Sequence, residues 1–232
     1  MWTLLRRMLR LSFWMLLGFV LATVLLVALL RVVNPVSSGI MLFRSHQAWQ
    51  AQRPFVARRC WTDLKDMGVA LPMSVIAAED QRFKDHWGFD LVELKAALSS
   101  KRTRTRGAST LSQQTAKNLF LWPTRSWLRK GLESYFTVLI ESLWSKPRIL
   151  EIYLNTVEFG PGLFGACAGA RAHFQREAGA LSAQQAAQLA AILPNPHRLR
   201  ANPPDATVSA KAARIVRQVR QLDGKAYLDA LH

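Results

Sequence analysis

Acidic residues are scarce in this sequence: 15 aspartates and glutamates stand against 31 lysines and arginines, a formal net charge of +16. Most of this excess remains when the four arginines of the first 31 residues are set aside. Such a balance favours anionic partners, either nucleic acid or phosphate-bearing lipid. One stretch breaks the pattern, because residues 77–90, AAEDQRFKDHWGFD, hold four of the 15 acids.

Cysteine is scarcer still. Cys60 and Cys167 lie far apart and form no C-x-x-C pair, so a disulfide in an oxidising compartment and two buried thiols both stay open. No group of His and Cys has the spacing of a structural zinc site, and we therefore predict no metal site. Few stretches from about residue 61 alternate like a strand, and no internal repeat is present, which predicts a mainly α fold.

A long uncharged segment lies near the N-terminus. Residues 11–30, LSFWMLLGFVLATVLLVALL, carry no charge, and as a helix they would span roughly 30 Å, the thickness of a bilayer's hydrocarbon core. Arg6, Arg7 and Arg10 precede this run, which predicts a cytoplasmic N-terminus. The run is longer than a usual signal-peptide core and no clear A-x-A site follows, so we favour an uncleaved anchor over a cleaved signal peptide.

This anchor sets the predicted organisation of the chain. We expect a cytoplasmic tail at 1–10, a transmembrane anchor at 11–33, a linker and irregular membrane-proximal segment at 34–60, and one domain at 61–232 outside the membrane. An exported domain beside a membrane rarely meets nucleic acid, so its basic charge is better suited to lipid phosphate.

Capping patterns divide that domain into helices. Pro72 is placed to open a helix through residues 73–80, and Asp205 to open a last one. Two segments rich in small residues, 99–110 and 158–170, separate helices, and the first is basic. Three pairs have capping-box spacing: Asp90 and Glu93, Thr110 and Gln113, Ser182 and Gln185. Apolar residues between 126 and 144 predict one buried stripe: Trp127, Leu128, Leu132, Phe136, Leu139 and Leu143.

Glu79 and Asp80 end the apolar run SVIAA. A carboxylate at the end of a buried helix loses water, which suits it to general-base chemistry. Capping, or an ion pair with Arg82, would be the simpler role. Phe83 and His86 lie four and seven residues after Glu79, so a continuing helix would place all three on one face, with His86 in a supporting role.

Two more polar groups follow. Thr110, Gln114 and Lys117 recur at spacings of four and three near a helix N-terminus, which is typical of a phosphate cradle but also of a solvated polar face. Arg129 and Glu133 are spaced i, i+4 before the apolar stripe, and a surface ion pair alone would explain them.

Taken together, these segments resemble a known family. Five of them occur in the family's order: EDQRFKDHWGFD, GASTLSQQTAKN, RKGLE, KPRILEIYLNTVEFGPGLFGACAGARAHF and LSAQQAAQLAAILPNP. The series is similar to the peptidoglycan glycosyltransferases of family 51, also found as the N-terminal module of class A penicillin-binding proteins, over about residues 61–200. No Ser-x-x-Lys or Lys-Thr-Gly motif of a transpeptidase is present, so the resemblance implies the monofunctional, membrane-anchored form.

The resemblance implies a lysozyme-like helical glycosyltransferase domain with a small membrane-facing jaw and a mobile loop near 99–106. It implies polymerisation of lipid II into β-1,4-linked glycan strands by inverting transfer, with undecaprenyl pyrophosphate released. By family analogy Glu79 is the catalytic base and Glu133 a second essential carboxylate, while Tyr153 helps to hold the fold together. The other expected residues bind substrate or pyrophosphate or shape the cleft: Lys117, Arg129, Lys130, Asp80, Phe83, His86, Ser109, Thr110, Gln114 and Asn118.

No cofactor is expected to be required, although a divalent cation (Mg or Mn) could assist at the pyrophosphate. The expected partners are lipid II, the growing glycan strand, the bacterial inner membrane, and proteins of cell-wall elongation or division, with the catalytic domain in the periplasm. Two alternatives remain. A glycan-cleaving muramidase or lytic transglycosylase would have no pyrophosphate for Lys117 to hold, and a non-catalytic envelope scaffold could dispense with Glu79 or Glu133.

Overall fold

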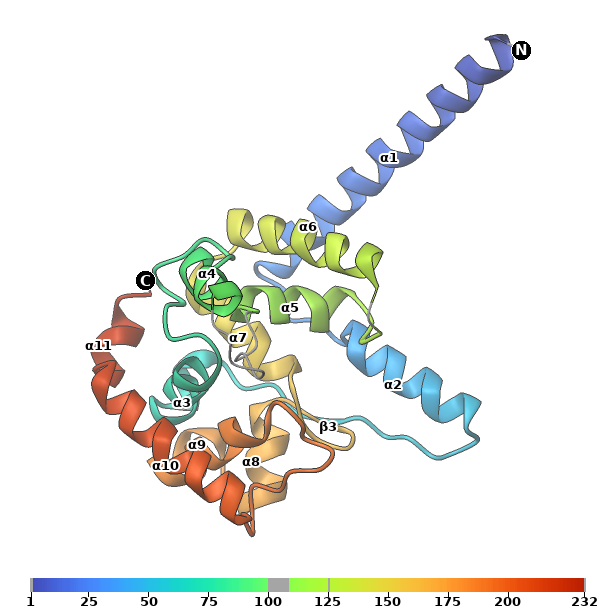
Figure 1. Ribbon diagram of the computed structural model, residues 1–232. Coiled ribbons are helices and arrows are strands. Elements are labelled where there is room, and N and C mark those ends of the chain that lie inside the picture. Colours follow the sequence, from blue (N-terminus) through green and yellow to red (C-terminus); the bar gives the residue numbers. More distant parts are fainter. Residues whose placement is uncertain (1, 100–108, 125, 232) are drawn as a thin grey trace.

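The structure, a computed structural model, describes residues 2–99, 109–124 and 126–231, so the loop expected near 99–106 lies outside it except for Ser99. Helices account for most of these residues (Figure 1). The helices are α1 Trp2–Leu30, α2 Gly39–Gln50, α3 Ala70–Glu79, α4 Leu91–Ser99, α5 Leu111–Phe120, α6 Trp127–Leu143, α7 Lys146–Thr156, α8 Ala166–Phe174, α9 Ala183–Ile192, α10 Ala206–Gln221 and α11 Gly224–Asp229. Two 3₁₀ turns are η1 Leu64–Met67 and η2 Ala178–Ala180, and three short strands are β1 Arg58–Arg59, β2 Glu158–Gly160 and β3 Leu163–Phe164.

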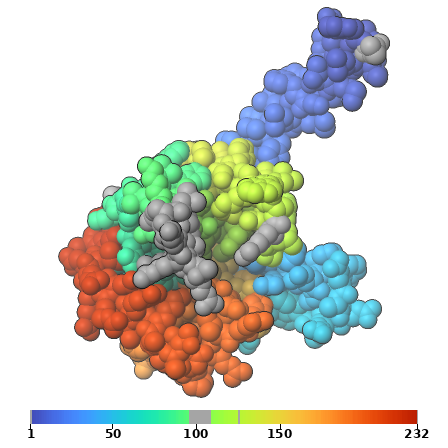
Figure 2. Space-filling model, in the orientation of Figure 1, coloured from blue at the N-terminus to red at the C-terminus, as the bar shows by residue number. Residues whose placement is uncertain are grey.

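Helix α1 is long and apolar enough to cross a membrane, and most of its length stands clear of the other helices (Figures 1 and 2). Its C-terminal turns are held against α6. The hydroxyls of Thr23 and Tyr135 lie 2.7 Å apart, and the indole N–H of Trp144 donates to the Val27 carbonyl at 2.7 Å. Helix α1 is therefore packed against the domain at its C-terminal end and not joined to it by a flexible linker.

The segment at 34–60 is not the irregular linker that we predicted, because it contains α2. Ser38 caps this helix by accepting a hydrogen bond from the Met41 backbone N–H. Gly39 follows, and a Cβ there would lie 2.3 Å from the Leu121 carbonyl oxygen, so only glycine allows α2 to approach the end of α5 this closely. Residues that suggested a linker thus form a helix start and a close packing contact.

The core is built around α3, which is apolar on all sides and buried from Leu71 through Ala78. Helices α9 and α10 pack against it, while α5 packs against both α6 and α7. The predicted capping boxes at Thr110 and Ser182 are both formed, and Asp205 caps α10 as expected. These local signals fix the starts of α5, α9 and α10, and α5 carries Gln114 and Lys117.

Three local predictions are wrong. Trp127 and Leu128, expected in the buried stripe of α6, are 93% and 70% exposed, so the stripe that packs against the core begins at Leu132. The helix at 73–80 starts earlier, at Ala70, and ends at Glu79, so no helical face joins Glu79 to the residues of 81–88, which form turns. Helix α10 is not the last, since α11 follows it.

A small three-stranded sheet of order β1-β3-β2 joins the membrane-proximal segment to the domain. β1 runs parallel to β3, and β2 runs antiparallel to it. Next to this sheet Cys60 and Cys167 form a disulfide, with their Cα atoms 5.6 Å apart. Of the two states left open by the sequence, the structure has the disulfide.

Candidate active site

Glu79 is the last residue of α3, at the point where the buried helix reaches the surface. Its Oε2 accepts a hydrogen bond of 3.0 Å from the side-chain N–H of Gln114, which lies on α5. The Gln114 amide also reaches the backbone carbonyl of Ser109 at 3.4 Å and accepts from the Tyr153 hydroxyl at 3.1 Å. Glu79 is therefore positioned by a neighbouring helix and is only half-buried.

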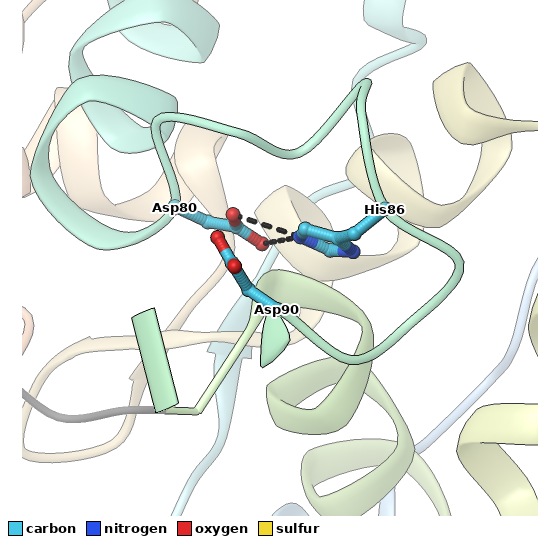
Figure 3. Close-up of side chains that lie close together, drawn as sticks. All are labelled: Asp80, His86 and Asp90. Atoms are coloured by element: carbon cyan, nitrogen blue, oxygen red, sulfur yellow. Dashed lines mark hydrogen bonds and ion pairs between the residues drawn. The ribbon is translucent and has the colours of Figure 1, made fainter. Parts of the chain in front are cut away.

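Asp80 stops α3 and connects it to α5. Its carboxylate accepts from the His86 ring at 3.0 and 3.1 Å (Figure 3). It also accepts from the Leu111 backbone N–H at 2.9 Å. Since Leu111 is the first residue of α5, this contact adds to the helix cap that Thr110 provides. Asp80 and His86 thus fix the angle between the helices that carry Glu79 and Gln114.

Asp80, His86 and Asp90 offer three ligand atoms within 4.8 Å of one another (Figure 3). Their hydrogen bonds account for this arrangement without an ion. Asp90 accepts from the backbone N–H groups of Val92 and Glu93, both at 3.0 Å, and so caps α4, and the His86 nitrogen nearest the cluster is bonded to Asp80. A cation would have to displace these bonds, so the cluster fits a structural role better than a metal site.

We expected Phe83 to shape the cleft. Its ring has no exposed surface, so it does not form the cleft wall directly. It lies under Lys146, whose ammonium is 4.6 Å from the ring centroid. Lys146 also donates to the His86 carbonyl at 2.7 Å and to Glu141 at 2.8 Å. This ammonium fastens the turn that follows Asp80 to the buried carboxylate of α6.

A second carboxylate and two cations lie on the first turns of α6. Glu133 contacts the Arg129 guanidinium and the Lys130 ammonium, each at 2.5 Å. Its side chain is only 4% exposed and that of Arg129 only 11%, so this pair is buried and is not the surface ion pair that spacing alone allowed, while Lys130 is 41% exposed at the edge of the cluster. These cations compensate the buried negative charge of Glu133, and Glu133 in turn holds their positive groups in a fixed place.

Lys117 lies on α5 between the two carboxylates. Burial lowers the pKa of its ammonium below the ordinary value of 10.5, Glu133 and Glu79 oppose that shift, and Arg129 and Lys130 reinforce it. All four charged groups therefore act on the Lys117 ammonium. Glu79 on α3 and the three charged residues of α6 thus belong to one electrostatic site. No described residue forms an ion pair or hydrogen bond with the Lys117 ammonium.

Lys117 faces a hollow of about 380 Å³, which we call the Lys117 hollow. Its walls come from α2, α5, α7, β2 and the turn after α9. The lining residues are Ile40, Arg44, Gln114, Lys117, Asn118, Tyr153, Val157, Glu158, Leu193, Pro194, Asn195, Pro196 and His197. Gln114 lines this hollow and donates to Glu79, which lies outside the lining, so one side chain contacts both.

The sequence did not single out the far wall of the hollow. Glu158, buried on β2, accepts from Arg44 of α2 at 3.3 Å and lies 3.0 Å from the His197 ring. These residues come from three distant segments, so no local spacing joins them. Of the predicted residues, Thr110 does not belong to the polar stripe facing the hollow, because its buried hydroxyl caps α5 and donates to the Gly88 carbonyl at 2.7 Å.

Fold and site together define a helical enzyme domain in which two carboxylates and two further cations act on Lys117, and Lys117 faces an open hollow, a site suited to group transfer from an anionic donor. Comparison with known proteins agrees. The model of the transglycosylase family matches residues 47–220. The chain therefore belongs to the transglycosylase family, whose fold is a lysozyme-like glycosyltransferase fold.

Three relatives cover nearly the whole chain, and each is named biosynthetic peptidoglycan transglycosylase. The one from Ectopseudomonas mendocina (strain ymp) is 51% identical over 228 residues, 97% of this chain and 93% of its own length. The one from Pseudomonas putida (strain W619) is 50% identical over 228 residues, 97% and 95% of the two chains. The one from Pseudomonas syringae pv. syringae (strain B728a) is 48% identical over 232 residues, 99% and 97%.

Proposed function

We propose that this protein polymerises lipid II into β-1,4-linked peptidoglycan strands and releases undecaprenyl pyrophosphate. The observation that carries the proposal is the electrostatic coupling of Lys117 to Glu79 and Glu133 beside an open hollow. A carboxylate that can take a proton and a cluster of cations that can receive a pyrophosphate are the two requirements of this transfer. The shared name of the three relatives supports the same activity.

In the proposed reaction Glu79 removes the proton from the 4-hydroxyl of the acceptor sugar. That oxygen forms a bond to C1 of the donor sugar while the bond from C1 to the pyrophosphate oxygen breaks, so the configuration at C1 inverts. The electrons of the broken bond leave with the pyrophosphate, and its developing charge is stabilised by Lys117, Arg129 and Lys130. Glu133 keeps the last two cations in place.

Lys117 is the cation best suited to meet the leaving group, because its ammonium has no ion-pair partner among the described residues. Asn118 lies on the same helix and Ser109 just before its cap, and both would contact the sugars or the pyrophosphate. We propose that no metal ion is required, since three cations already supply the charge, although Mg or Mn could still assist.

We further propose that α1 anchors the protein in the bacterial inner membrane with the domain in the periplasm. Three arginines at the start of α1 support a cytoplasmic N-terminus. The disulfide between Cys60 and Cys167 supports an oxidising compartment for the domain. The membrane-proximal segment exposes the apolar side chains of Val36, Leu42, Trp49 and Val56, which would contact the bilayer. Proteins of cell-wall elongation or division are proposed partners.

The full chain, purified in detergent and given labelled lipid II, tests the activity. We expect glycan polymer that lengthens with time. A folded protein that binds lipid II without making polymer would favour the envelope scaffold. Shortening of a finished glycan strand would favour the muramidase.

A further inference from the structure

Tyr153 on α7 is the largest side chain that is fully buried in the described part of the chain. Its ring belongs to the hydrophobic core, which explains why its position in ILEIYLN suggests a purely structural role. The hydroxyl is different, because it lies 3.1 Å from the Oε1 atom of Gln114, and both residues line the Lys117 hollow. Helices α7 and α5, which carry the two residues, pack against each other (Figure 1).

The donor and acceptor roles of Tyr153, Gln114 and Glu79 follow from the chemistry of each group. Gln114 has a carbonyl oxygen that only accepts and an amide nitrogen that only donates. Glu79, as a carboxylate, only accepts, so the Gln114 nitrogen must face it, and the distance of 3.0 Å fits that bond. The Gln114 oxygen must then point to Tyr153, which donates its O–H.

Tyr153 keeps its proton under working conditions. Burial raises the pKa of its hydroxyl well above the ordinary value of 10.0, and the charge of Glu79 raises it further. An amide can rotate by 180° and exchange its oxygen for its nitrogen. The reversed amide would place its oxygen against the Glu79 carboxylate, two acceptors together, and would leave the Tyr153 proton without the acceptor that Oε1 supplies, so the two neighbours together favour the observed orientation.

We propose that Tyr153 is a positioning residue that acts through Gln114 to hold Glu79 in its reactive orientation. This inference rests on the proposed role of Glu79 as the base. Gln114 occupies the Oε2 atom of Glu79, while Oε1 accepts no hydrogen bond from any described residue. We call the two hydrogen bonds from Tyr153 to Gln114 and from Gln114 to Glu79 the relay. The relay leaves Oε1 of Glu79 directed to the acceptor hydroxyl and prevents Glu79 from rotating Oε2 into the position of Oε1.

Tyr153→Phe removes the hydroxyl and keeps the buried ring. In lipid II polymerisation by the full chain, we expect kcat to fall about tenfold while KM stays within about twofold, because a displaced base slows chemistry without weakening binding. Tyr135→Phe is the matched control, since it removes a tyrosine hydroxyl bonded to Thr23 of α1, and it should leave kcat unchanged. A wild-type kcat in Tyr153→Phe would overturn the relay.

A double-mutant cycle separates the relay from a general loss of packing. Gln114→Met should lower kcat at least as far as Tyr153→Phe, and adding Tyr153→Phe to it should change kcat less than about twofold. Equal losses from Tyr153→Phe in both backgrounds would overturn the proposal. These outcomes are distinct from failure of the proposed function, which would appear as an inactive wild type or an active Glu79→Gln protein.

Gln114→Glu carries the test if Tyr153→Phe yields no folded protein. The new carboxylate still accepts from Tyr153, but it places a second acceptor against Glu79. We expect a tenfold or larger loss of kcat with a melting temperature close to that of the wild type. A retained kcat would contradict the proposal.

Discussion

Phe83→Ala tests the claim that the turn after Asp80 is fastened from within the core. The substitution leaves a cavity where a fully buried ring lay, which costs roughly 3–5 kcal/mol of unfolding free energy. It also removes the contact with the Lys146 ammonium at 4.6 Å. For a domain of this size we expect the melting temperature to fall by roughly 6–20 °C. The assay is thermal unfolding of the detergent-purified chain at a fixed scan rate.

Trp87→Ala is the matched control, because this aromatic side chain belongs to the same turn but is 57% exposed. Its cost should stay within about 0.5 kcal/mol. The Phe83→Ala protein that remains folded at low temperature should bind lipid II with a KM close to that of the wild type, since the ring reaches no cleft surface. A loss of stability below about 1 kcal/mol together with a raised KM would refute this reasoning and make Phe83 a substrate contact.

Three further predictions concern charge. Lys117→Met should abolish polymerisation and raise the melting temperature at neutral pH. Burial lowers the pKa of Lys117, so its charged ammonium destabilises the fold, and removing it should be stabilising. A lower melting temperature would contradict this. Burial raises the pKa of Tyr227 from 10.0 to about 12, so stability should fall as pH rises from 10 towards 12, and Tyr227→Phe should flatten that fall in alkaline melts. EDTA should leave both the melting temperature and polymerisation unchanged, and a loss restored by Mg or Mn would show a metal requirement.

Sequence reasoning succeeded where the signal is local. The capping boxes at Thr110 and Ser182 and the cap at Asp205 each satisfy backbone groups within three residues, so their spacing alone predicts the helix starts. The functional roles of Glu79 and Glu133 stay predictions from the family motifs; both carboxylates oppose the lowering of the Lys117 pKa.

Sequence reasoning failed where contacts between distant segments determine the local structure. No Gly or Pro marks the end of α3 at Glu79. The chain turns there because the Asp80 carboxylate accepts a hydrogen bond from Leu111, 31 residues away. Tyr153 looks like an ordinary core residue until Gln114 is placed against its hydroxyl. The signal that could have found it is a lone hydroxyl in an otherwise apolar, buried stretch. Ser38 was assigned to a linker because small polar residues are typical of loops as well as of helix caps.

The most direct test of the central claim is the polymerisation rate of Glu79→Gln with lipid II held at saturation. Loss of a general base should lower kcat by roughly 10²–10⁴-fold, while binding of lipid II and the melting temperature stay close to those of the wild type. Glu177→Gln is the matched control, because this carboxylate forms an exposed pair with Arg171 and should keep full activity. A Glu79→Gln protein that polymerises lipid II at the wild-type rate would contradict the account.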